Sequence, residues 1–98
     1  VYERGFVVKL IFSPTFIRAS KRLLKRNNHL SGVVEAALKS LQANMFNPNL
    51  RTHKLKGKFE NYWSCSVTRD IRIVFKIVKQ SDEEAILLQS IGTHDKVY

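Results

Sequence analysis

The alternation of apolar and polar side chains is clearest at residues 70–77. The apolar set there is Ile71, Ile73, Phe75 and Ile77, and the alternate set is Asp70, Arg72, Val74 and Lys76. Because successive side chains of a β-strand point to opposite faces, this period of two predicts a strand that seals a hydrophobic core on one side. A guanidinium in mid-strand is costly to bury alone. We therefore expect Arg72 to have a structural partner, such as Asp70 or a backbone carbonyl, or to face a ligand; on spacing alone, a strand arginine is more often an exposed residue of the solvated face.

Three more strands follow from the same kind of pattern. Residues 6–12 are apolar on both faces apart from Lys9, which predicts a first strand in the interior of the sheet. Residues 62–67 alternate, with Trp63, Cys65 and Val67 on the core side. Residues 85–91 form the last strand. Turns at 68–70 and 79–83 make the last three strands an antiparallel meander.

Two helices are expected between the first strand and this meander. Ser13 is placed to cap the first helix and Pro14 to occupy its first position, and residues 27–29 end it. Ser31 is expected to cap the second helix, which has a well-formed apolar stripe. The stripe consists of Val34, Ala37, Leu38, Leu41 and Met45. The short link between the helices predicts an antiparallel hairpin that covers one sheet face.

The predicted fold is α+β with the order β-α-α-β-β-β, in a single domain over residues 1–98. With both helices on one face, the other face of the sheet is left open. The polar residues expected on that open face are Ser64, Ser66, Asp70, Arg72 and Lys76.

The charge of the chain indicates what kind of partner it binds. The chain has 17 Lys and Arg against 8 Asp and Glu, a net charge of +9, and the polar face of the first helix is wholly positive. That face consists of Arg18, Lys21, Arg22, Lys25 and Arg26. So basic a protein favours polyanions such as nucleic acid or the ribosome, or an acidic protein partner. No apolar run approaches the ~20 residues needed to span a bilayer. The single cysteine, Cys65, fits a reducing cytoplasm.

The chemistry-bearing side chains suggest RNA cleavage rather than metal or cofactor chemistry. The three histidines, His29, His53 and His94, are far apart in the sequence, and we expect no metal and no cofactor. We expect Cys65 to lie in the core. Cleavage of an RNA phosphodiester needs a base for the 2′-OH, cations at the phosphate and an acid for the leaving 5′-oxygen. Candidates for these roles, and for RNA binding, are His53, Asp70, Arg72, His94 and Tyr98, with Arg51, Lys54, Lys56, Lys58, Ser66 and Lys76.

Three segments carry a resemblance to a known family. They are THKLKG at 52–57, DIRIVFKI at 70–77 and IGTHDKVY at 91–98. With the leading strand–helix–helix unit, the chain resembles the RelE/ParE toxin superfamily, and within it the YafQ branch of bacterial toxin–antitoxin ribonucleases. The resemblance implies a small α+β ribonuclease that contacts 16S rRNA and cleaves mRNA in the ribosomal A site. It also implies a cognate antitoxin, and binding to operator DNA only through the antitoxin complex.

The resemblance also assigns roles to individual residues. It implies that His53 and His94 are acid and base in an unassigned order, that Arg72 stabilises the phosphate, that Asp70 orients and that Tyr98 stacks or handles a proton. Two positions depart from the pattern. Ser66 stands where the YafQ pattern has a second histidine, and Ser90 stands where it has an arginine.

Two rival functions remain open at this point. One is a ParE-like toxin that binds DNA gyrase and cleaves nothing, and the other is a toxin-like basic module that only binds RNA or an antitoxin. The combination of imidazole and cationic groups favours the ribonuclease, because a gyrase binder has no need of it.

Overall fold

The structure is a computed structural model, and it describes residues 8–98, the side chain of Lys96 apart. Its helices and strands are β1 (Lys9–Phe12), α1 (Pro14–Arg26), α2 (Ser31–Ala43), β2 (His53–Lys54), β3 (Trp63–Ser66), β4 (Ile71–Gln80), β5 (Glu83–Thr93) and α3 (His94–Val97). Short 3₁₀ turns span Asn28–Leu30, Pro48–Leu50 and Gly57–Phe59. The predicted α+β order is confirmed, and the structure adds β2 and α3 to it.

The five strands form one sheet in the order β1-β5-β4-β3-β2. β1 pairs with β5 in parallel, and the other neighbouring strands are antiparallel. The prediction that the first strand lies in the interior is wrong, because β1 is at the edge; Phe6 and Val7 of the predicted strand lie outside the described residues. Its apolar side chains are covered from one side only. Phe12 is 47% exposed and packs edge-on against Phe16, with the ring centroids 5.8 Å apart.

Helix α1 begins as its sequence predicts. The Ser13 hydroxyl accepts a hydrogen bond from the Phe16 N–H at 3.0 Å and donates one to the Gln89 carbonyl at 3.2 Å. One side chain therefore caps the helix and ties its start to β5.

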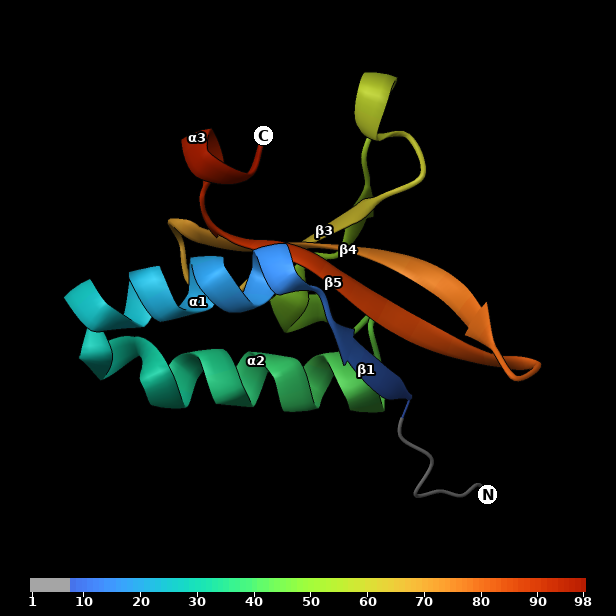
Figure 1. Cartoon of the computed structure of the whole chain (residues 1–98), viewed down its shortest axis with the longest axis horizontal. Coiled ribbons are helices and arrows are strands. Elements are labelled where there is room, and N and C mark those ends of the chain that lie inside the picture. The colour runs from blue at the N-terminus through green and yellow to red at the C-terminus, as the bar shows by residue number, and fades with distance from the viewer. Residues whose placement is uncertain (1–7) are drawn as a thin grey trace.

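Helix α2 begins differently from the prediction. Ser31 is already helical, with φ −53° and ψ −49°, and Leu30 precedes it without a side-chain cap. The predicted Ser31 cap is wrong because the 3₁₀ turn Asn28–Leu30 runs directly into the helix. Helices α1 and α2 lie on the same side of the sheet, as an antiparallel pair (Figure 1).

The core lies between these helices and the sheet. The alternation along β4 is confirmed, because Ile73 and Phe75 are fully buried there together with Leu41 and Leu88. Cys65 is buried in the same core, as expected.

The opposite face of the sheet is only partly open. After β5 the chain turns back, and α3 lies over that face (Figure 1). Ser64, Val74 and Val97 are consequently buried. The expectation of an open face is therefore wrong where α3 packs and holds toward Ser66, Asp70 and Arg72, which keep some exposure.

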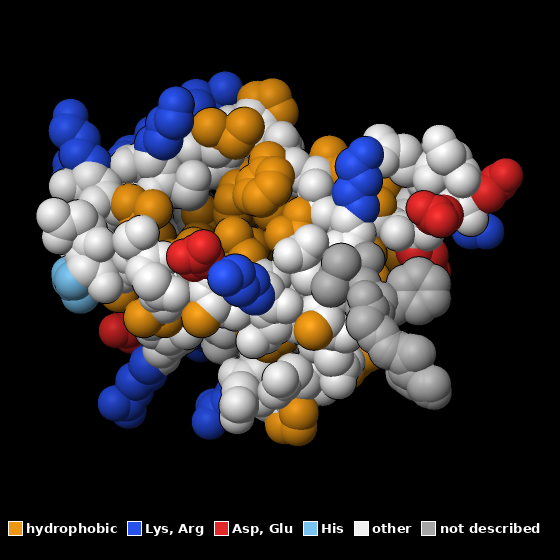
Figure 2. All heavy atoms as spheres, turned by 90° about the horizontal axis from the view of Figure 1, so that it is seen from below, with side chains coloured by type: hydrophobic (Ala, Val, Ile, Leu, Met, Phe, Trp, Pro, Cys, Tyr) orange, Lys and Arg blue, Asp and Glu red, His pale blue; other side chains and the backbone are white. Residues whose placement is uncertain are grey.

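The helix side of the molecule combines apolar and basic surface. Figure 2 shows hydrophobic side chains gathered in the middle of this face, with Lys and Arg most numerous along its upper left margin and others scattered over the face. The large exposed apolar residues are Phe12, Ile17, Val33 and Phe46. Within the described part of the chain, no helix is long and apolar enough to cross a membrane.

Two substitutions in α2 test the position of the core. Leu41→Ala should lower the free energy of unfolding by about 2–5 kcal/mol, because Leu41 is 0% exposed and its loss leaves a cavity. Val33→Ala, in the same helix at a site 41% exposed, should change it by no more than about 0.5 kcal/mol. Urea unfolding measures both, and equal effects would contradict the packing described.

Candidate active site

The candidate catalytic side chains come from β2, β4 and the C-terminal segment, on the sheet face opposite α1 and α2. In the strand register, His53 is opposite Ser64, Ser66 is opposite Arg72, and Arg72 is opposite Gly92. Side chains directly opposite each other share a face, with Cβ atoms ~4.5–5.5 Å apart. The register therefore gathers His53 and Arg72 on one surface, with two serines between them.

His53 has a defined tautomer when it is neutral. Its Nδ1 lies 3.1 Å from the carbonyl oxygen of Arg51, a residue held in the left-handed region at φ 50°. A carbonyl only accepts hydrogen bonds, so Nδ1 carries the proton and Nε2 keeps its lone pair. His53 is exposed, so this nitrogen is accessible to a substrate as a proton acceptor.

Arg72 has a backbone partner and not an acidic one. Its Nη1 donates to the carbonyls of Thr68 at 3.1 Å and Arg69 at 2.7 Å, which closes the turn between β3 and β4. Asp70 is exposed, and in the described part of the chain it makes no ion pair with Arg72. Both bonds use Nη1, so Nη2 and Nε of the guanidinium can still meet a ligand.

His94 and Tyr98 lie together at the start and end of the α3 turn. Their ring centroids are 4.5 Å apart, and the Phe59 ring lies 6.3 Å from that of Tyr98. The His94 side chain is 73% exposed, with Nδ1 3.9 Å from an Asp95 carboxylate oxygen. The Tyr98 hydroxyl donates a hydrogen bond to Ser64. The structure thus offers an accessible imidazole beside an anchored aromatic ring.

The predicted RNA-binding residues surround this face unevenly. Lys54 is opposite Trp63 in the register, so it starts on the other face of the sheet from His53. The Lys76 Nζ lies 5.6 Å from the Tyr62 ring centroid, and the Lys58 Nζ lies 5.4 Å from that of Phe59. These two cation–π contacts place positive charge beside aromatic surface.

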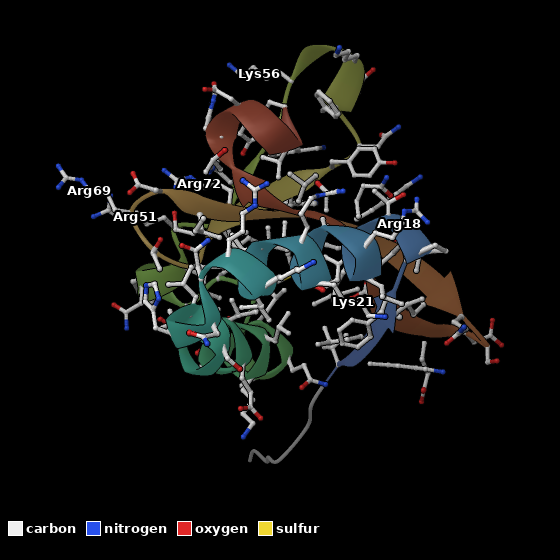
Figure 3. The ribbon with its side chains drawn as sticks, turned by 60° about the vertical axis from the view of Figure 1, so that its left-hand side comes forward. Arg18, Lys21, Arg51, Lys56, Arg69 and Arg72 are labelled. Atoms are coloured by element: carbon white, nitrogen blue, oxygen red, sulfur yellow. The ribbon has the colours of Figure 1, made fainter. Side chains whose placement is uncertain are left out.

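Further cations extend this surface beyond the sheet. Figure 3 shows Arg51, Arg69 and Arg72 at one end of the sheet, Lys56 on the loop above, and Arg18 and Lys21 on α1. Arg51, Lys56 and Arg69 are exposed. Arg51, Lys56 and Arg69 therefore add positive charge on the side of the candidate site, of the kind that follows a nucleic-acid backbone, whereas Arg18 and Lys21 belong to α1 on the other side of the sheet.

Ser66 and Ser90, the two departures from the expected pattern, both lie on the site face. Ser66 is opposite Arg72, and Ser90 is opposite Val74. Ser90 also lines a cavity of about 360 Å³ between α1 and the end of β5, together with Arg22 and Arg26. This cavity reaches Thr93, next to His94, but none of the candidate catalytic side chains lines it.

Sequence reasoning missed two features of the site. It placed Ser64 on an open surface, whereas Ser64 is 0% exposed and bonded to Tyr98. It also gave no role to Phe59 and Tyr62, which with Tyr98 form an aromatic cluster. No periodicity in the sequence signals either feature, because both depend on the fold of the C-terminal segment.

Metal ligands do not cluster in the part of the chain that the structure describes, where no three His, Cys, Asp or Glu side chains lie together. Cys65 is not a nucleophile of this site. Burial raises the pKa of its thiol from 9.0 to about 12, so it is neutral at physiological pH.

Comparison with known proteins gives one family and a consistent fold. Residues 8–98 match the family described as the bacterial toxin of type II toxin–antitoxin systems, YafQ. No curated protein matches the chain significantly.

Three solved structures illustrate the similarity of fold. YafQ from E. coli BL21(DE3) is 15% identical with a TM-score of 0.76, over 93% of this chain and 98% of that one. A metal-bound toxin from Helicobacter pylori is 23% identical with a TM-score of 0.75, over 93% and 99%. The toxin of the E. coli DinJ–YafQ toxin–antitoxin complex is 16% identical with a TM-score of 0.73, over 93% and 97%.

The Cys65 thiol should resist labelling in the folded protein. At a pH below 9.0 it is protonated and buried, so a thiol-reactive reagent should modify it only as fast as the protein opens. The measurement is labelling over time by mass spectrometry, with the denatured chain as control. Rapid stoichiometric labelling of the native protein would contradict the placement of Cys65.

Proposed function

Since the chain belongs to the YafQ family of type II toxin–antitoxin toxins, we propose that it is a ribosome-dependent mRNA endoribonuclease that inhibits translation. The observation that carries this proposal is the gathering of His53, Arg72, His94 and Tyr98 around one accessible sheet face. An acid, a base and a fixed cation are the parts that RNA cleavage through the 2′-OH requires.

In the proposed reaction, His53 is the base. Its Nε2 takes the proton of the 2′-OH, because Nδ1 already donates to the Arg51 carbonyl. The 2′-oxygen attacks phosphorus, and the bond from phosphorus to the 5′-oxygen breaks. His94, as an imidazolium, gives its proton to that leaving oxygen. The products are a 2′,3′-cyclic phosphate and a 5′-hydroxyl end.

Arg72 stabilises the charge that builds on the phosphate. Its two carbonyl bonds hold the guanidinium in place before the substrate arrives, so little reorganisation is needed during the reaction. A planar guanidinium can contact two phosphate oxygens at once, which a lysine ammonium cannot copy. Tyr98 stacks on a base of the A-site codon, and Asp70 orients a neighbouring group in the bound complex.

The basic surface supports binding to the ribosome. A net charge of +9 and exposed cations on α1 and the 51–58 loop suit contacts with 16S rRNA phosphates. The same charge suits a cognate antitoxin with an acidic or amphipathic segment, and an E. coli relative was solved bound to DinJ. Contact with operator DNA belongs to that toxin–antitoxin complex and not to the toxin alone.

The decisive experiment incubates the protein with translating ribosomes and maps the mRNA 5′ ends. Wild type should cut, whereas Arg72→Ala should be roughly 10²–10³ slower and His94→Ala roughly 10²–10⁴ slower, with ribosome binding nearly unchanged. Arg72→Lys should recover little. Truncating Tyr98 should also slow cutting. His29→Ala is the matched control, because it removes an exposed histidine from the 3₁₀ turn between the helices.

The outcomes separate the functions. Full-rate cutting by both Arg72→Ala and His94→Ala would overturn the site. Intact mRNA with arrested DNA supercoiling would select the gyrase inhibitor, and binding without either effect would select the non-catalytic module. Because a Helicobacter pylori relative was solved with bound metal, the toxin should first be treated with EDTA and desalted. The treated toxin should then cut mRNA at the same rate as untreated toxin, in a buffer in which Mg²⁺ is the only divalent metal ion.

Antitoxin binding should depend on charge through its association rate. We expect nanomolar affinity or better, and an on-rate that falls with added salt more than the off-rate rises, because steering acts before contact. Arg18→Gln with Lys21→Gln should slow association. Lys39→Gln is the control, since Lys39 already lies 3.9 Å from Glu35. Stopped-flow kinetics measure these rates, and a salt-insensitive on-rate would exclude steering.

A further inference from the structure

Ser64 is a buried polar residue of the core-lining strands. Its side chain is 0% exposed, and it lies in β3 between His53 of β2 and Val74 of β4. A buried hydroxyl without a partner is costly, so buried polar groups are nearly always hydrogen-bonded. The partner of Ser64 is the Tyr98 hydroxyl, which comes from 34 residues further along the chain.

The segment that carries His94 has few attachments of its own. Helix α3 has only four residues, and a helix so short is not stable by itself. The last two residues of the segment both contact the sheet. Val97 packs to 8% exposure, and the Tyr98 hydroxyl bonds to Ser64. A hydrogen bond is directional, so the bond from Tyr98 to Ser64 fixes the position and the orientation of the Tyr98 ring.

Four side chains follow one another across the sheet face. His53 is opposite Ser64 in the register, Ser64 bonds to Tyr98, and the Tyr98 ring lies 4.5 Å from the His94 ring. The row joins two imidazoles that come from residues far apart in the sequence. Ser64 is the second of its four members, and it is too deeply buried to touch RNA itself.

We propose that Ser64 is a positioning residue of this site, which acts through Tyr98 to hold His94 on the same face as His53. The inference rests on the proposed endoribonuclease function. Acid and base must flank one phosphodiester, and a displacement of about 1 Å can cost roughly 10²-fold in rate. Without the Ser64 hydroxyl, the Tyr98 hydroxyl forms its hydrogen bond with water instead. The Tyr98 ring then no longer holds the His94 imidazole in place.

The first test is a matched pair, Ser64→Thr and Ser64→Val. The two side chains have nearly the same volume and crowd the buried site equally, so they differ only in the hydroxyl. Single-turnover cleavage on ribosomes should be roughly 10–100-fold slower in Ser64→Val than in Ser64→Thr, with similar ribosome affinity and similar melting temperatures. Equal rates in the pair would overturn the inference.

A second set tests the route through Tyr98 and His94. Ser64→Ala and Tyr98→Phe should each slow cleavage, and the double variant should be no slower than either, because both remove one hydrogen bond. In a His94→Ala background, Ser64→Ala should slow cleavage less than it does in the wild type, because only the stacking by Tyr98 is left to disturb. Ser40→Ala removes a hydroxyl from α2, on the far side of the sheet, and should cut at the wild-type rate. Additive losses in the double variant would overturn the inference.

A third readout needs no activity. The Tyr98 ring current should shift the His94 imidazole resonances in the NMR spectrum, and Ser64→Ala and Tyr98→Phe should each move them toward free histidine. Unmoved resonances would overturn the inference even if wild type cuts mRNA. A wild-type protein that does not cut at all would instead overturn the proposed function, and with it the catalytic part of the role given to Ser64.

Discussion

The alternation of side chains along β4 is the constraint on which both the core and the candidate site depend. Ile73 and Phe75 point to the helices, while Arg72 and Val74 point to the other face. A slip of one residue would exchange the two sets and bury the guanidinium in the core. A two-residue turn fixes the register at one end, with Ser81 at φ 54° and Asp82 at φ 67°, values that suit the right-handed twist of a hairpin. Between Val74 and Phe75 the register of β4 with β5 shifts, because Val74 is opposite Ser90 and Phe75 is opposite Leu88.

Arg72 has a structural role in a turn and, in the proposed reaction, a catalytic one. Its bonds to the Thr68 and Arg69 carbonyls satisfy two backbone acceptors of a turn that would otherwise rely on water. They also hold the guanidinium still, which is what a preorganised electrostatic contact requires. A carboxylate partner would have neutralised the group. A carbonyl partner leaves its full positive charge for a phosphate.

The two sides of the sheet divide stability from function. Below it, α1 and α2 supply the continuous apolar packing of the core. Above it, Arg72 stands on the long strand β4, but the rest of the candidate site is built from a two-residue strand, an exposed loop and a four-residue helix, elements that have little stability of their own. Single tertiary contacts, such as the one between Tyr98 and Ser64, therefore matter more on the upper face than any single contact does in the core.

The sequence by itself predicted the main elements and the candidate chemistry. The period of two in residues 70–77, the Ser13–Pro14 start of α1 and the apolar stripe of α2 from Val34 to Leu41 are local signals, and each appears in the structure. Met45, predicted to continue that stripe, lies beyond the end of α2 at Ala43. His53, Arg72, His94 and Tyr98 could be named because their side chains carry chemistry that few residue types offer.

Tertiary structure decided where these parts meet. β1 is an edge strand although its pattern reads as interior, because pairing partners are chosen by the whole sheet. Arg72 bonds to backbone carbonyls and not to Asp70, because the turn brings the carbonyls of Thr68 and Arg69 within hydrogen-bond distance. Ser64 is buried because α3 folds back over it. The pairing of β1 with β5 and the bond between Tyr98 and Ser64 join residues far apart in the chain, and such contacts leave no periodic trace in the sequence. The order of elements was therefore predictable, while the packing of α3 over the sheet face was not.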